Sequence, residues 1–182
     1  MSQPRDPEPV KLLVSIFSPK EELIQKVTNE LTLRYGPVDW QSPALFFDRT
    51  RYYEKEMGWP LHRRFVSFER LISPDLIVSI KLESNELEGQ YVQEGKRLVN
   101  IDPGYISLER LVLATGKNYV HRIYLGRGIY ADLTLVFKRG SFRPLEWTYP
   151  DYGDPKTIEM FNSLRKRYVE QLKELRKISK EK

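Results

Sequence analysis

Residues 119 to 137 alternate between apolar and polar side chains, with one interruption at Gly126-Arg127-Gly128. A period of two is typical of β-strands, because successive side chains point to opposite faces of a sheet. Glycine accepts the positive φ that a tight hairpin loop needs, so the interruption is the expected turn. The segment therefore predicts an antiparallel β-hairpin, and a hairpin of this kind requires a sheet in the fold.

Centring this hairpin on Arg127 predicts which side chains lie opposite each other. The apolar face then pairs Leu125 with Ile129, Ile123 with Ala131 and His121 with Leu133. The other face pairs Tyr124 with Tyr130 and Arg122 with Asp132. That face is either a solvated sheet surface or a platform for an anionic or planar ligand. His121, on the apolar face, is expected to be a core residue with little charge at neutral pH.

Other periodic segments predict an α+β fold. Val10 to Phe17 is a nearly continuous apolar run, which predicts a central strand buried on both faces. Helix starts are predicted after Ser18, after Ser73, at Ser107 and, for a long C-terminal helix, at Asp154-Pro155. Further strands are expected at Ala44–Asp48, Phe65–Leu71, Arg97–Ile101 and Phe142–Trp147.

The first six elements follow the order β-α-β-β-α-β, which predicts a ferredoxin-like core with two helices on one face of an antiparallel sheet. The β-hairpin and the long C-terminal helix extend this core. Residues 1–9 contain three prolines and are expected to be a flexible tail. Residues 10–182 are expected to form a single α+β domain, since their number suits one hydrophobic core.

The composition excludes several kinds of chemistry. The chain has no cysteine, which rules out disulfides, thiol catalysis and cysteine-bound metal clusters. Its two histidines are far apart in sequence, so no metal site is predicted, and the sequence identifies no cofactor. No apolar run is long enough for a membrane helix. The first ten residues lack the apolar core of a secretory signal, so we expect a cytoplasmic protein.

The net charge of +5 is concentrated at the end of the chain. Residues 165–182 hold eight Lys or Arg and three Glu, which already gives +5, so residues 1–164 are neutral overall. A basic C-terminal helix is more often a solvated surface than a nucleic-acid-binding arm. The charge therefore does not by itself predict a polyanion-binding body.

No complete catalytic motif is present. The phosphate-binding loop of nucleotide hydrolases is missing, because Asn118 follows Gly116-Lys117 and Leu111 stands at the place of its first glycine. What remains is Asp102, at the end of a predicted strand. It is a candidate acid, base or cation ligand where strands end, and its alternative role is to stabilise a turn and a helix start.

Three segments are distinctive: RRFVSFERLISP (residues 63–74), NIDPGYISLERLVLATGKNYVHRIYLGRGIYADLTL (100–135) and WTYPDY (147–152). They resemble a widespread, mainly bacterial family that is classified only as domain of unknown function 4416. The resemblance covers nearly the whole chain from Val10 onward. Some relatives are labelled GTP-binding, but the phosphate loop and a guanine-reading Asn-Lys-x-Asp motif are missing here. The resemblance therefore implies a family and no activity.

Three functions follow from these residues. The leading hypothesis is a protein that binds an anionic ligand, a nucleotide or RNA, on an Arg/Tyr-rich sheet face. Its predicted ligand-binding residues are Lys117, Arg122, Tyr124, Arg127, Tyr130 and Asp132. The first alternative is an enzyme that acts on a phosphorylated or sugar substrate with Asp102 and His121 as acid and base. The second alternative is a scaffold protein that self-associates, as a homo-oligomer, through its C-terminal helix.

Overall fold

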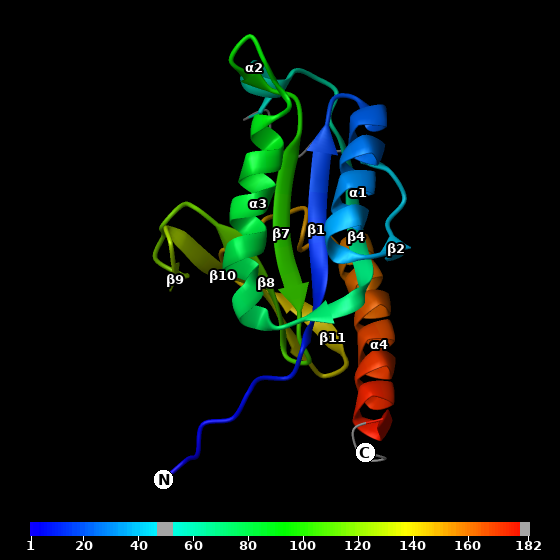
Figure 1. Ribbon diagram of the computed structural model, residues 1–182, viewed down its shortest axis with the longest axis vertical. Helices are drawn as coiled ribbons and strands as arrows, with labels where there is room; N and C mark the ends of the chain where they lie inside the picture. Colours follow the sequence, from blue (N-terminus) through cyan, green and yellow to red (C-terminus); the bar gives the residue numbers. More distant parts are fainter. Residues whose placement is uncertain (47–52, 179–182) are drawn as a thin grey trace.

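The computed structural model describes residues 1–46 and 53–178 of the chain. Within these residues the fold is α+β, as predicted, with one large antiparallel sheet and helices on both of its faces (Figure 1). The helices are α1 (Glu21–Tyr35), α2 (Glu54–Met57), α3 (Ile77–Gly89) and α4 (Pro155–Ile178), with a 3-10 turn, η1, at Pro74–Leu76. The strands are β1 (Val10–Ser18), β2 (Val38–Gln41), β3 (Leu45–Phe46), β4 (His62–Ile72), β5 (Val92–Gln93), β6 (Lys96–Arg97), β7 (Asn100–Ile106), β8 (Arg110–Thr115), β9 (Arg122–Gly126), β10 (Ile129–Lys138) and β11 (Ser141–Pro144).

The strands of the large sheet follow the order β11-β10-β8-β7-β1-β4-β2. β3 pairs with β4 and β9 pairs with β10, while β5 and β6 form a small ribbon of their own. The predicted central strand is confirmed, because β1 lies between β7 and β4 and all nine of its residues are buried. A strand with neighbours on both edges and helices on both faces needs apolar side chains on both sides, which explains its unbroken apolar run.

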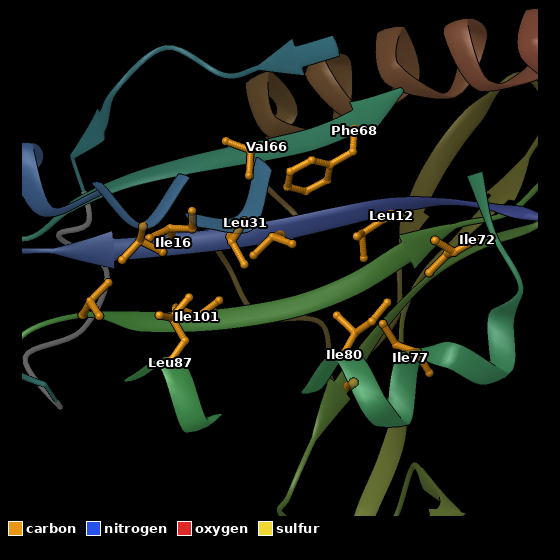
Figure 2. Close-up of a cluster of buried hydrophobic side chains, with 14 of the residues drawn as sticks. Leu12, Ile16, Leu31, Val66, Phe68, Ile72, Ile77, Ile80, Leu87 and Ile101 are labelled. Atoms are coloured by element: carbon orange, nitrogen blue, oxygen red, sulfur yellow. The ribbon is translucent and has the colours of Figure 1, made fainter. Parts of the chain in front are cut away.

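Alternate residues of β1 belong to two different cores. Leu12, Val14 and Ile16 pack against the buried stripes of α1 and α3, for example against Leu31 and Ile80 (Figure 2). Side chains alternate along a strand, so Leu13 points to the opposite face. There it joins the core under α4, together with Phe65, Leu111, Leu135, Phe161, Leu164, Tyr168 and Leu172.

The helix predicted from Ser107 is wrong. Residues 107–109 form a turn between β7 and β8, and Tyr105 pairs with Val112 across this hairpin. Ser107 Oγ donates to the carboxylate of Glu109 and accepts the Glu109 N–H, at 2.8 and 3.3 Å. The same side-chain chemistry that caps a helix also closes a turn, so the serine signal was misread.

Several strand bounds differ from the prediction. The strand expected at Arg97–Ile101 runs from Asn100 to Ile106, and the one expected at Phe142–Trp147 ends at Pro144. Of the strand expected at Ala44–Asp48, the structure gives Leu45–Phe46 as β3, and residues 47 and 48 lie outside the described residues. The edge of the sheet beside β4 is formed instead by β2, whose four residues were not predicted as a strand.

The predicted hairpin is present as β9 and β10. Its register is confirmed for Arg122 with Asp132 and for Tyr124 with Tyr130. The predicted pair of Leu125 and Ile129 is wrong, because Ile129 pairs with Gly126 and the register shifts before Tyr130. Such a bulge near a tight turn increases strand twist. None of the helices in the described part of the chain has the length and apolar character needed to cross a bilayer.

Candidate functional site

The sheet divides next to β7. β7 pairs with β1 along its whole length but, among the described residues, with β8 only through Gly104, Tyr105 and Ile106. Proline has no N–H for a ladder, and Pro103 stands where the pairing with β8 stops. Beyond this point β8 stays paired with β10, which also carries β9. We refer to β8, β9 and β10 as the wing, and to residues 100–103 of β7 as the open edge; β9 and β10 project to the left of the sheet in Figure 1.

Gly104 allows β7 and β8 to approach closely at this junction. A Cβ atom at Gly104 would collide with the carbonyl oxygen of Val112 and lie 2.8 Å from a methyl carbon of Leu113. Only glycine fits where one backbone comes this close to another. The junction is therefore a tight attachment point from which the wing diverges.

A cavity of about 670 Å³ lies between the open edge and the wing. This volume is typical of sites for small molecules. Four rings supply flat, apolar parts of its lining: Phe17, Tyr53, Tyr149 and Tyr152. Its charged lining residues are Arg63, Lys81, Arg97, Lys117, Arg122, Glu88, Asp102, Asp132 and Asp151. With five basic and four acidic groups, the lining is strongly charged and carries a small positive excess.

The cavity brings four of the predicted site residues together: Asp102, Lys117, Arg122 and Asp132. Asp102 comes from the open edge, Lys117 from the turn after β8, and the other two from the wing. They approach from opposite sides of the division in the sheet. The remaining predicted residues, His121, Tyr124, Arg127 and Tyr130, lie elsewhere on the wing or behind the cavity wall.

Arg122 is fixed in place by three acceptors. Its Nε donates to Asp132 Oδ2 over 2.9 Å, Nη1 to the carbonyl oxygen of Lys117 over 2.9 Å, and Nη2 to the hydroxyl of Tyr149 over 2.8 Å. The Arg122 and Asp132 side chains are both almost fully buried, so the ion pair is shielded from water and salt. These contacts hold the guanidinium plane in one orientation at the cavity wall.

His121 lies behind Asp132 and not on the apolar face that the register predicted. Its Nε2 is 3.2 Å from Asp132 Oδ2, and its ring stacks on Trp147 with centroids 4.9 Å apart and planes 10° apart. β9 begins only at Arg122, so the alternation did not extend to position 121. The side chain is buried as predicted, but its neighbours are a carboxylate and an indole.

Two long side chains of α3 satisfy the backbone of the open edge. Lys81 Nζ donates to the carbonyl oxygen of Ile101 over 3.0 Å, and Glu88 Oε1 accepts the Ile101 N–H over 2.6 Å. These groups replace the neighbouring strand that β7 lacks here, because buried backbone groups need partners. Lys81 also contacts Asp102 Oδ1 over 3.2 Å, and Asn100 Nδ2 donates to Asp102 Oδ2 over 2.6 Å.

Arg97 joins α2 and α3 at the end of this cluster. It donates to Glu56 over 2.6 and 3.1 Å and to Glu88 over 2.8 Å. Burial raises the pKa of the Glu88 carboxyl above its ordinary value, although Lys81, the Ile101 N–H and Arg97 act in the opposite direction. The hydrogen bonds from Arg97 lower the pKa of Glu56. Both acids are therefore held by partners, and of the two only Glu88 lines the cavity.

Arg63 and the tyrosines form the remaining wall. Arg63 makes an ion pair with Asp151, and its guanidinium carbon lies 5.3 Å from the centre of the Phe17 ring and 5.6 Å from that of Tyr152. Burial raises the pKa of Tyr53 to about 12, and the nearby charge of Asp102 acts in the same direction. The Tyr53 phenol therefore stays protonated at neutral pH, when it can both donate and accept a hydrogen bond.

The face of the hairpin carries the other predicted ligand-binding residues. The rings of Tyr124 and Tyr130 lie 5.2 Å apart, as expected for an opposed pair, and Arg127 is exposed at the turn with a φ of 53°. Side chains of β9 and of the residues just before it are unusually exposed for their type, among them Tyr119, Val120, Ile123, Tyr124 and Leu125. This surface is separate from the cavity lining.

Five charged residues of the lining were not predicted: Arg63, Lys81, Glu88, Arg97 and Asp151. A signal did exist for two of them. Lys81 and Glu88 lie seven residues apart on the stripe of α3 that also buries Ile77, Ile80 and Leu87. Charged residues on an otherwise apolar, inward-facing stripe need buried partners and so point to a polar site.

Metal binding has little support in this geometry. Among residues 1–46 and 53–178, no group of three or more His, Asp or Glu side chains is placed to hold a metal ion. The acidic residues of the cavity are paired instead with Lys81, Arg97, Arg122 and Arg63. Carboxylates neutralised in this way are arranged for hydrogen bonding to a ligand or for structural support.

The chain belongs to the family described as Domain of unknown function (DUF4416), whose model matches residues 8–168. This match covers the whole sheet, the cavity and most of α4. Searches of curated proteins and of solved structures found no match. The family assignment agrees with the resemblance noted in the sequence and attaches no activity to the cavity.

Proposed function

We propose that this protein binds an anionic small molecule, of about the size of a nucleotide, in the cavity between β7 and the wing. The observation that carries the proposal is the guanidinium of Arg122. The three acceptors found among the described residues use three of its five N–H donors and leave one on each terminal nitrogen. An N–H group left on each terminal nitrogen can donate a charge-assisted hydrogen bond to an oxygen of a phosphate or carboxylate.

The surroundings of Arg122 support an anionic ligand with a planar or apolar part. Lys117 lines the same wall and adds a second positive charge. Tyr149, which fixes Arg122, and Tyr53 and Tyr152 provide aromatic surfaces within the same cavity. Rings of this kind stack on nucleobases or pack against sugars. The volume of about 670 Å³ suits a ligand of this size.

Calorimetric titration with inorganic phosphate and with adenosine 5′-monophosphate at low salt tests the proposal. Arg122→Lys keeps the charge beside Asp132 but loses the planar fork, so the affinity for either ligand should fall roughly tenfold. The matched control is Arg127→Gln on the same hairpin, outside the cavity, which should bind like the wild type. The proposal fails if the wild type binds neither ligand, or if Arg122→Lys binds as tightly as the wild type.

A second candidate is RNA binding on the hairpin surface. It is favoured by the exposure of Tyr124 and Arg127 at the turn and of Tyr119 before β9, since exposed rings and an arginine can stack on unpaired bases. The same variants separate the two functions. Loss of single-stranded RNA binding in Arg127→Gln, without any effect of Arg122→Lys on it, would assign the hairpin to RNA.

Acid–base catalysis by Asp102 and His121 has weaker support. Asp102 faces the cavity and contacts Lys81, whereas His121 contacts Asp132 and Trp147 on the far side of the wall. Two groups that act on one substrate need to reach it from the same space. We therefore propose binding in preference to catalysis by this pair.

Three further proposals concern architecture and context. The order β7-β1-β4-β2 among strands that alternate with α1 and α3 supports a ferredoxin-like core.

A cysteine-free chain is compatible with a cytoplasmic location, which we propose on that basis. Self-association through α4 would use the exposed Leu175 and Ile178 at its C-terminal end, because the apolar stripe earlier in α4 packs on the sheet. Sedimentation velocity measures this association directly.

A further inference from the structure

We infer that the ligand of this cavity carries two different groups: an anionic group for Arg122 and a hydroxyl or amino group for Asp102. This inference rests on the proposed function and specifies its ligand class. Asp102 is the acidic group of the lining that remains substantially accessible, with 36% of its side chain exposed, compared with 4% for Asp132 and 17% for Asp151. Its carboxylate is therefore available to a bound molecule.

Asp102 is oriented by two donors on separate oxygens. Lys81 reaches Oδ1 over 3.2 Å, and Asn100 reaches Oδ2 over 2.6 Å. A carboxylate has about four lone-pair directions, so one further bond to each oxygen is compatible with this arrangement. The side chain is thus held in place and retains the capacity to accept hydrogen bonds from a ligand.

The open edge of β7 requires that two charged side chains of α3 be buried, which is unfavourable in itself. Lys81 and Glu88 are 7% and 6% exposed, and both are used to satisfy the backbone of Ile101. A neighbouring strand would satisfy these groups without burying charges, which is unfavourable unless they are well paired. The arrangement keeps the space beside Asp102 open, and this space is part of the cavity.

The two walls have opposite chemical preferences. The wing presents Arg122 and the segment after β8 presents Lys117, whereas the open edge presents the Asp102 carboxylate. A carboxylate repels a phosphate but accepts hydrogen bonds from hydroxyl and amino groups. A ligand that satisfies both walls is a phosphorylated compound with donor groups at its other end, such as a sugar phosphate or a nucleoside monophosphate.

The test compares three probes by calorimetry: inorganic phosphate, ribose 5-phosphate and adenosine 5′-monophosphate. In Asp102→Asn, phosphate should bind at least as tightly as in the wild type, because a negative charge has been removed. The two larger probes should lose roughly tenfold in affinity relative to phosphate, since a hydrogen bond to a charged acceptor is weakened. Asp75→Asn, an exposed carboxylate on η1, is the matched control and should leave all three affinities unchanged.

The outcomes separate the two proposals. If no probe binds the wild type, the proposed function itself fails. If the probes bind with the expected dependence on Arg122, but Asp102→Asn leaves their relative affinities unchanged, only the two-group ligand is overturned. If Asp102→Asn does not fold, the wild type alone decides. It should bind ribose 5-phosphate more tightly than ethyl phosphate, which lacks donors, and equal affinities would refute the inference.

Discussion

Arg122 and Asp132 lie directly opposite each other on β9 and β10, and the Arg122 Nε donates to Asp132 Oδ2 over 2.9 Å. Asp132 is buried, and it also contacts His121 and Thr134. Removing its charge leaves the buried guanidinium poorly compensated. We expect Asp132→Asn to lower the free energy of unfolding by about 2 to 3 kcal/mol. Urea denaturation measures this change, with Asp6→Asn in the exposed tail as the control; equal stability of the two variants would contradict the prediction.

Substitution of His121 tests whether it supports the wall or takes part in chemistry. His121→Phe keeps a ring against Trp147 and loses the contact with Asp132, so stability should fall by about 1 kcal/mol. The affinity for phosphate should stay within about twofold of the wild type, which is less than the change expected from losing one hydrogen bond. A well-folded His121→Phe variant that no longer binds phosphate would instead give His121 a direct role.

Substitution by alanine should have opposite effects on stability at Gly104 and at Gly89. Gly104→Ala forces a Cβ against the Val112 backbone and should destabilise the protein by about 2 to 3 kcal/mol. Gly89 is the last residue of α3, and no heavy atom lies within 4 Å of the Cβ that an alanine would add there. Gly89→Ala should therefore stabilise the protein by about 0.5 kcal/mol. Thermal unfolding of the two variants measures both changes. Similar melting temperatures would mean that the β7–β8 junction is not tightly packed.

Glu56 gives a pH dependence with a definite sign. Because Arg97 lowers the pKa of Glu56, the folded state binds this proton less readily than the unfolded chain. The pair therefore stabilises the fold above the ordinary glutamate value of 4.5, and its contribution is lost as the pH falls through the lowered pKa. Both side chains are partly exposed, so Glu56→Gln should cost only about 1 kcal/mol at neutral pH.

The measurement for Glu56 is urea denaturation of the wild type and Glu56→Gln between pH 3 and 7, at roughly 25 °C. The difference in stability should close at the acidic end. Glu170→Gln, an exposed residue of α4, serves as the control with a small and nearly constant effect. A difference that grows on acidification would contradict the assigned direction.

The basic end of α4 should govern non-specific binding of polyanions. Replacing the exposed Lys166, Lys173 and Lys177 with Gln should reduce the salt dependence of DNA binding by about 2 to 3 in the logarithmic slope. Phosphate binding in the cavity should be unaffected. The control exchanges three exposed lysines elsewhere, Lys20, Lys55 and Lys96. An equal effect of both triple variants on DNA binding would show that the position of the charge is unimportant.

The sequence predicted local relationships better than distant ones. The pairing of Arg122 with Asp132 followed from alternation around a short turn, where register is fixed by neighbouring residues. Asp102 was selected on a local signal too, as an acidic residue at the end of a predicted strand, although it lies within β7 and not at a turn or helix start. The central position of β1 was also predictable, because burial on both faces leaves an unbroken apolar run.

The composition of the cavity depended on contacts across the fold. Arg63 meets Asp151, and Lys81 meets Asp102, over 88 and 21 residues of chain, and no periodicity carries such pairings. The division of the sheet could not be predicted either. It arises where the pairing between β7 and β8 stops at Pro103, and the sequence predicted a helix from Ser107 in place of β8. Without β8 in the sheet, the wing had no predicted position relative to Asp102.

Because β7 and β8 are joined by a short ladder at Gly104, the twist between these two strands sets the distance between the two walls of the cavity. Arg122 and Asp102 belong to parts of the sheet that are joined through three residue pairs, so a few degrees of rotation there would move one wall relative to the other. On the proposed function, the aperture between the walls would select ligands by length. Relatives with different residues at this junction could therefore accept longer or shorter molecules while every contacting side chain stayed the same.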